Sequence, residues 1–197
     1  LKFLAGSESL KELKILDLRS NNITDEGAVE FSNSVNYPNI QKVELSDNNL
    51  TDIGKNALKS FLIQNLIHKR IKETDGIMTC DLSNLGIGDL ECEYISKYKE
   101  FNNLNHLYLE LNNITEKGVQ TLTESEILKC VTLLSLDRNK IGDTGIQFIV
   151  ESENFKNLTH LMIEHNNISD EGLKFIASSE NMSNLLRIYQ IQRNSIK

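Results

Sequence analysis

Apolar and polar residues follow one order along this chain, and the order returns about every 27 residues. Each copy of it reads L-x-x-L-x-L-x-x-N-x-I-x-x-x-G. Such a period predicts a solenoid, because one copy cannot bury its own apolar face and has to stack on its neighbours. The clearest copies are LKILDLRSNNITDEG (13–27), IQKVELSDNNLTDIG (40–54), LNHLYLELNNITEKG (104–118), VTLLSLDRNKIGDTG (131–145) and LTHLMIEHNNISDEG (158–172).

Each copy predicts a short strand followed by a helix. Alternating apolar residues, such as Leu107 and Leu109, point to one side of a strand and into the core. Apolar residues one and four places after the glycine fall on one face of a helix, and a third, ten places after it, covers the return to the next strand. The aligned copies predict seven strand units, which begin at Leu13, Ile40, Ile77, Leu104, Val131, Leu158 and Leu186.

One asparagine in each regular copy stands where the chain leaves the strand. Its amide can donate to and accept from backbone groups that no strand partner satisfies, so we interpret these asparagines as structural. The next residues, such as Thr24, Asp25 and Glu26, place a hydroxyl at a helix start and carboxylates in its first turn. The asparagines are Asn21, Asn48, Asn112, Asn139, Asn166 and Asn194.

These copies resemble the leucine-rich repeat superfamily, and a period of 27 to 28 residues with a full helix is similar to its ribonuclease-inhibitor subtype. The resemblance implies an α/β fold: an open right-handed solenoid, or horseshoe, of about seven repeats, with a parallel sheet on the concave face and helices on the convex face. It covers 1–197 as a single domain. In that family, partner proteins usually dock on the concave face or its rims. The resemblance therefore implies a protein–protein interaction module with no chemistry of its own.

Two features depart from a regular array. The segment LKFLAGSESL (1–10) matches LKFIASSENM (173–182), so the chain opens inside a copy, and we expect it to be a fragment of a longer protein. About ten extra residues separate the second and third strands. We expect this insertion, at 65–76, to form the end of a longer helix and then a basic projecting loop that either binds a partner or is merely tolerated.

Composition and charge narrow the function classes. No apolar run approaches the roughly 20 residues needed to cross a bilayer, so we expect no membrane insertion. The net charge of −7 argues against nucleic-acid binding, because an acidic groove repels phosphate. Cys80, Cys92 and Cys130 form no CxxC pair, which favours a reducing compartment and a cytoplasmic protein.

The sequence contains no motif for catalysis, a cofactor, a metal ion or a small-molecule substrate. It lacks a Walker loop, a G-x-S-x-G elbow, an HExxH helix and the cysteine spacing of zinc sites. His106 and His160 occupy equivalent positions two copies apart, which puts them about 10 Å from each other at the usual strand spacing. That distance is too long for both to bind one metal ion. We therefore expect ordinary surface histidines and no enzyme.

Function is expected in the strand positions that the repeat leaves free, because their side chains project from the concave face. Acidic residues dominate the first half of these positions, and apolar and polar residues mix in the second half. Mixed clusters of this kind are typical of interface centres. The predicted partner-binding residues are Asp17, Arg19, Glu44, Asp47, Asp81, Tyr108, Glu110, Leu111, Asp137, Arg138, Met162, Glu164 and His165.

Two alternatives to a simple binding module stay open at this point. In repeat type the chain resembles GTPase-activating proteins of the Ran-activating kind, which act through rim residues, and Arg19 is the nearest rim arginine in an early copy. It also resembles the target-recognition domains of innate immune sensors and of effectors that intracellular bacteria deliver into host cells. In each case the partner is a protein.

Overall fold

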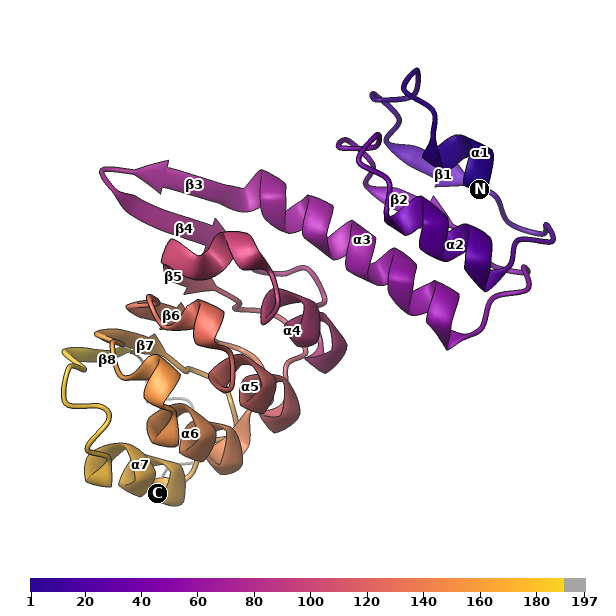
Figure 1. Ribbon diagram of the computed structural model, residues 1–197. Coiled ribbons are helices and arrows are strands. Elements are labelled where there is room, and N and C mark those ends of the chain that lie inside the picture. Colours follow the sequence, from indigo (N-terminus) through magenta and orange to yellow (C-terminus); the bar gives the residue numbers. More distant parts are fainter. Residues whose placement is uncertain (190–197) are drawn as a thin grey trace. The chain divides into compact units, whose positions relative to one another are not determined.

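The computed structural model describes residues 1–189, and its chain divides into two compact units, Leu1–Lys69 and Arg70–Lys197. Each unit is an α/β solenoid segment built from strand-and-helix copies (Figure 1). Among the predicted structural residues, Asn194 lies outside the described part. The description of the chain as a single domain stays a prediction.

The first unit has a small two-stranded parallel sheet and a core of aromatic residues. Strands β1 and β2 pair with Ile15 opposite Lys42 and Asp17 opposite Glu44. Beneath them the ring of Phe31 lies 4.8 Å from that of Tyr37 and 5.5 Å from that of Phe61, centroid to centroid. The elements are α1 (Lys2–Ala5), β1 (Ile15–Asp17), α2 (Asp25–Ser32), β2 (Lys42–Glu44) and α3 (Asp52–Arg70), whose last residue belongs to the second unit.

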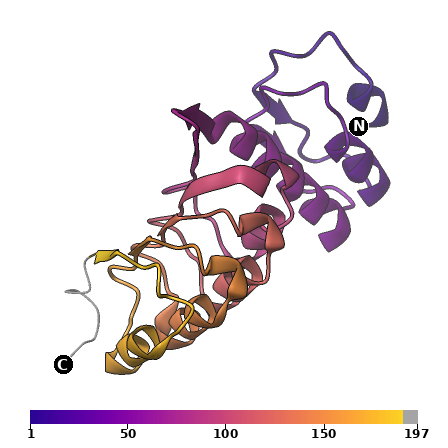
Figure 2. The ribbon, with the colours of Figure 1, turned by 60° about the vertical axis from the view of Figure 1, so that its left-hand side comes forward.

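The second unit has a six-stranded sheet in the order β3-β4-β5-β6-β7-β8, parallel except for β3. Helices α4 to α7 stack along one side of this sheet (Figures 1 and 2). Its strands are β3 (Ile71–Thr74), β4 (Ile77–Asp81), β5 (Leu104–Tyr108), β6 (Leu133–Ser135), β7 (His160–Met162) and β8 (Arg187–Tyr189). Its helices are α4 (Asp89–Ile95), α5 (Glu116–Thr123), α6 (Gly142–Glu151) and α7 (Asp170–Ser178), with 3-10 turns at Lys99–Asn103, Glu126–Leu128 and Glu153–Phe155.

The predicted strands form, with one correction to the register. Met162 pairs with Tyr189, so the last copy starts at Leu185 and not at Leu186. The step from the copy before is then 27 residues, like most of the others. The predicted core positions are also confirmed, since Leu107, Leu134 and Leu161 are fully buried between the sheet and the helices.

The insertion at 65–76 differs from its prediction. The longer helix is present, but the projecting loop is wrong: the chain leaves α3 directly into β3, which pairs antiparallel with β4. Asp75 and Gly76 form the two-residue turn, with φ values of 53° and 77°. A pair of residues with positive φ matches the twist of a hairpin, and Asp-Gly is a favoured sequence for it. The edge of β4 is therefore taken by β3.

A ladder of buried asparagines joins neighbouring copies. The amide of Asn139 donates to the carbonyls of Leu109 and Leu136, each at 2.9 Å, and accepts from the backbone N–H of Ile114 at 2.9 Å. Asn48 and Asn112 make the equivalent bonds. Each amide thus satisfies backbone groups of its own copy and of the copy before, as the sequence predicts.

A second ladder, which the repeat pattern did not predict, runs between the helix starts. The carboxylate of Asp89 accepts from the backbone N–H and hydroxyl of Thr115, at 2.9 and 2.7 Å, and from the N–H of Gly118 at 3.0 Å. Asp25 and Asp143 make the same three bonds to the following copy. A carboxylate in the first turn of one helix therefore caps the next helix.

This second ladder explains the glycine of the repeat. A Cβ on Gly118 would lie 2.6 Å from Oδ1 of Asp89 and 3.0 Å from the Cys92 sulfur. Gly54 and Gly172 have an aspartate oxygen equally close, at 2.5 Å. At these three glycines the capping carboxylate occupies the space that a side chain would need.

We expect Gly118→Ala to lower the free energy of unfolding by about 1–3 kcal/mol, as overpacking does, because the methyl group displaces the Asp89 carboxylate. Gly27→Ala is the matched control: its Cβ would meet only ordinary contacts, with Leu1 at 3.5 Å the nearest atom. Thermal unfolding followed by circular dichroism measures both. Equal losses in the two variants would contradict the capping role.

Candidate functional site

The side of the second unit's sheet that faces away from the helices carries the candidate site, and we call it the open face. Residues of each strand alternate between the core and this face. Leu107 of β5 and Leu161 of β7 are fully buried, whereas Tyr108 and Met162, next along each strand, are only half-buried. Tyr108 and Met162 flank Ser135 in register on the neighbouring strand β6. Ser135 is 1% exposed, so the two larger side chains dominate this row.

A parallel row of the open face holds two histidines around a leucine. His106, Leu133 and His160 are register partners on β5, β6 and β7, and Leu133 is half-buried. The His106 ring meets the Tyr108 ring edge-on, with centroids 6.5 Å apart. Burial, with a smaller contribution from the His160 charge, lowers the pKa of His106. This row therefore adds a partly apolar strip beside Tyr108 and Met162.

Three carboxylates lie side by side where the strands end, and we call Glu110, Asp137 and Glu164 the acidic row. Backbone bonds from Leu111 to Asp137 and from Arg138 to Glu164 keep the three copies in register there. Oδ1 of Asp137 accepts from the backbone N–H of Glu164 at 2.6 Å. Burial, followed by the charges of Glu164 and Glu110, raises the pKa of Asp137. The fold therefore disfavours the charged form of Asp137.

The rim next to the acidic row is held in an unusual backbone conformation. Leu111, Arg138 and His165 have φ values of 57°, 56° and 55°, in the left-handed region. The chain turns at this point so that the following asparagine enters the core. Leucine is uncommon at such angles, and Leu111 is also 49% exposed. The rim thus presents an apolar side chain, an arginine and a histidine, the last 3.5 Å from the Glu164 carboxylate.

The predicted partner-binding residues fall into two groups. The first group lies on the second unit and shares its open face: Asp81, Tyr108, Glu110, Leu111, Asp137, Arg138, Met162, Glu164 and His165. The second group, Asp17, Arg19, Glu44 and Asp47, lies on the first unit. Leu133, His106 and His160 also belong to the open face but are missing from the prediction. The sequence could have predicted them, because they stand two places before the central strand position of each copy and alternate strand residues face the same side.

Charges in the first unit are paired with each other. Arg19 and Asp17 form an ion pair at 2.7 Å, and hydrogen bonds from Arg19 lower the pKa of Asp17 to about 2. Lys42 and Glu44 pair at 2.5 Å. In the second unit, Asp81 accepts from the N–H and hydroxyl of Ser83. Two of the acidic residues predicted for the early strands, Asp17 and Glu44, are therefore paired with cations within the fold.

Comparison with known proteins now identifies the repeat. Five segments match the Leucine Rich repeat family, at residues 10–32, 38–58, 102–122, 128–150 and 156–177, which together make up more than half of the chain. The chain belongs to the leucine-rich repeat family. Members of this family typically bind other proteins. No curated protein sequence matches the chain.

One solved structure gives a further comparison for the leucine-rich repeats. An internalin (inlF) from Listeria monocytogenes aligns with 100% of this chain at 19% sequence identity, with a TM-score of 0.41. The alignment covers 46% of the internalin chain, so the leucine-rich repeat chain spans less than half of that protein's length. Among the described residues of our chain, no helix has the length and apolar character that a membrane span requires.

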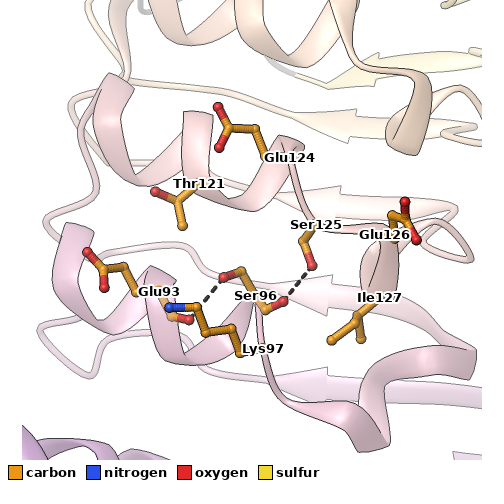
Figure 3. Close-up of a pocket in the computed structure, with 8 residues that line it drawn as sticks. All are labelled: Glu93, Ser96, Lys97, Thr121, Glu124, Ser125, Glu126 and Ile127. Atoms are coloured by element: carbon orange, nitrogen blue, oxygen red, sulfur yellow. Dashed lines mark hydrogen bonds between the residues drawn. The ribbon is translucent and has the colours of Figure 1, made fainter.

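The leucine-rich repeats also form a polar hollow between the ends of α4 and α5 (Figure 3). Ser96 donates to the carbonyl of Glu93, and Ser125 donates to the carbonyl of Ser96 at 2.6 Å. Ser152 and Ser179 bond equivalent carbonyls one copy back. These serines cap helix ends and link copies. The hollow is thus a product of stacking, bordered by the carboxylates of Glu93, Glu124 and Glu126.

Two of the cysteines are buried and poorly reactive, and the residues that the structure describes hold no metal-binding cluster. All three cysteines are free thiols. Burial raises the pKa of Cys80 to about 12, and it also raises the pKa of Cys92, so neither thiol ionises readily. Throughout residues 1–189, no group of three or more His, Cys, Asp or Glu is placed to hold a metal ion.

The raised pKa of Asp137 predicts a stability cost at neutral pH. The unfolded chain ionises near the usual value of 3.8, below the folded pKa, so stability falls as pH rises through that interval. We expect Asp137→Asn to raise the melting temperature at pH 7 and to have little effect at pH 3, because Asn can still accept from the Glu164 N–H.

Asp143→Asn is the control with the opposite sign. Burial acts to raise the pKa of Asp143, but hydrogen bonds from Ser169 and Gly172 outweigh it and the pKa is lowered. This group stabilises the fold above its unfolded pKa, and the effect is lost as pH falls through the folded pKa. Asp143→Asn should therefore be less stable than the parent at pH 7, with a deficit that narrows in acid. A Tm profile over this pH range in which both variants move the same way would refute the assignment.

Proposed function

We propose that this chain is a protein-binding module of the ribonuclease-inhibitor-like subtype, and that the open face of its second unit contacts the partner. The subtype rests on the 27-residue period and on the full helix that each regular copy contains. Free thiols at Cys80, Cys92 and Cys130 favour a reducing, cytoplasmic setting. The module acts by holding its partner and needs no catalytic group.

One observation carries the choice of surface. Tyr108, Leu133 and Met162 are large side chains that are only half-buried, and they lie on adjacent strands of one sheet. Exposed apolar groups that cluster and are bordered by polar ones mark interaction sites more often than scattered ones do. Tyrosine and methionine are also enriched at interface centres, because each covers a large contact area.

The rigidity of the scaffold supports the same surface. Leu107, Leu109 and Leu134, which alternate with the open-face residues, have no exposed area. Their packing fixes the strands from behind, so the side chains on the open face are held in place before a partner arrives. Preorganisation of this kind reduces the entropy lost on binding.

We expect Tyr108→Ala combined with Met162→Ala to abolish or strongly weaken partner binding while it leaves the melting temperature nearly unchanged. Leu109→Ala should instead lower the free energy of unfolding by about 2–5 kcal/mol, because it leaves a cavity in the core. A pull-down that uses the whole chain as bait, followed by thermal unfolding of each variant, measures both effects.

The pull-down and the unfolding measurements distinguish a binding role from a structural role. A partner captured by the parent and lost from the folded double variant would support the open face as the binding surface. Capture that survives the double variant would place the binding surface elsewhere. A loss of stability in Tyr108→Ala as large as in Leu109→Ala would show that Tyr108 serves the fold.

A further inference from the structure

We infer that the acidic row of the open face binds a lysine or arginine side chain of the protein partner, flanked by apolar residues that pack on Tyr108 and Met162. This inference rests on the proposed function and adds the chemical class of the partner segment. It follows from the charges on the open face, from one buried oxygen that makes no hydrogen bond, and from the apolar groups on either side.

Negative charge is concentrated on three neighbouring copies. Glu110, Asp137 and Glu164 follow strands that are paired in register, at a spacing of about 4.8 Å. Like charges at that spacing repel, and desolvation adds a further cost. In the first unit, by contrast, the carboxylates at the central strand position, Asp17 and Glu44, pair with Arg19 and Lys42. In the part of the second unit that the structure describes, Glu110 and Asp137 form no ion pair with a lysine or arginine.

One oxygen of the row makes no hydrogen bond. Oε2 of Glu110 is buried, and among the described residues no donor bonds to it. A buried carboxylate oxygen without a hydrogen bond lowers the free energy of unfolding of the isolated protein. A cationic donor from outside would satisfy Oε2 and would at the same time offset the repulsion along the row. The ammonium and guanidinium groups of lysine and arginine are the donors that proteins provide for this purpose.

Apolar groups lie on both sides of the row. On the strand side stand Tyr108 and Met162, and on the rim side stands Leu111, 49% exposed in a conformation that leucine seldom adopts. Lysine and arginine have long aliphatic stems that pack on apolar surfaces while the charged end reaches polar groups. The open face therefore suits a cationic side chain with apolar neighbours better than it suits a cluster of lysines alone.

The test uses an array of short peptides in which one central residue is arginine, lysine, citrulline or acetyl-lysine between varied apolar residues. Citrulline and acetyl-lysine keep the shape of the side chain and remove its charge. Binding of the whole chain is then measured by fluorescence anisotropy for the best peptides at low and high salt. We expect arginine or lysine peptides to bind, their neutral counterparts to bind roughly tenfold or more weakly, and salt to weaken the charged peptides.

The decisive variant is Glu110→Gln with Asp137→Asn, which preserves shape and removes two charges. We expect it to reduce binding of the charged peptides by roughly tenfold or more and to flatten the salt dependence. Glu124→Gln with Glu126→Gln is the matched control, since it removes two charges of the same sign from the polar hollow of Figure 3. This control should bind like the parent. Melting temperatures of both variants confirm that each is folded.

Several results would overturn the inference. They are equal binding of charged and neutral peptides, no binding of any cationic peptide at millimolar concentration, or equal losses in the acidic-row variant and its control. If the acidic-row variant still binds while Tyr108→Ala with Met162→Ala does not, the open face remains the binding surface and only the cationic partner is wrong. If neither open-face variant changes binding, the proposed function fails as well.

Discussion

Buried side-chain amides are the interaction on which this structure depends. A copy of the repeat is too small to satisfy its own backbone where the strand ends, and the asparagine at that place bonds to two copies at once. The consequence is a chain held together by contacts between neighbours, which is how solenoids gain stability. At Leu85 the amide is absent from its own copy, but the N–H of Leu85 is still satisfied by Asn112 of the next one.

Two more ladders of hydrogen bonds also link neighbouring copies. Aspartates at the helix starts cap the following helix, and serines at the helix ends bond the carbonyls of the preceding copy. All three ladders use short polar side chains that reach one copy away. The asparagines enter the core, and the other two ladders run along the helices. The central strand positions of the open face therefore take part in none of the three ladders. Tyr108 and Met162 occupy two of these central positions, and Leu133 lies in the neighbouring row of the same face.

The acidic row shows how the same regularity concentrates charge. A position that recurs every 27 residues returns to the same place on adjacent strands, so three carboxylates far apart in sequence become neighbours. In the first unit the positions that correspond to this row hold Arg19 and Ser46, and the carboxylates of Asp17 and Glu44 pair with Arg19 and Lys42. In the second unit, burial and the neighbouring charges of Glu164 and Glu110 raise the pKa of Asp137, so its ionised form reduces the stability of the fold. Residues that reduce stability and remain accessible are reasonable candidates for binding.

The sequence by itself determined the core leucines, the structural role of the asparagines and the strand positions of every copy but the last, because stacking identical copies forces an identical pattern of burial and hydrogen bonding. It also predicted which strand residues face away from the helices, apart from the row of His106, Leu133 and His160. Only the tertiary structure decided that the insertion ends in a hairpin, since pairing of β3 with β4 depends on a strand edge that local propensity does not describe. The same holds for the ion pair of Asp17 with Arg19 and for the unbonded oxygen of Glu110, because side-chain distances, and not residue spacing, determine which charges are neutralised.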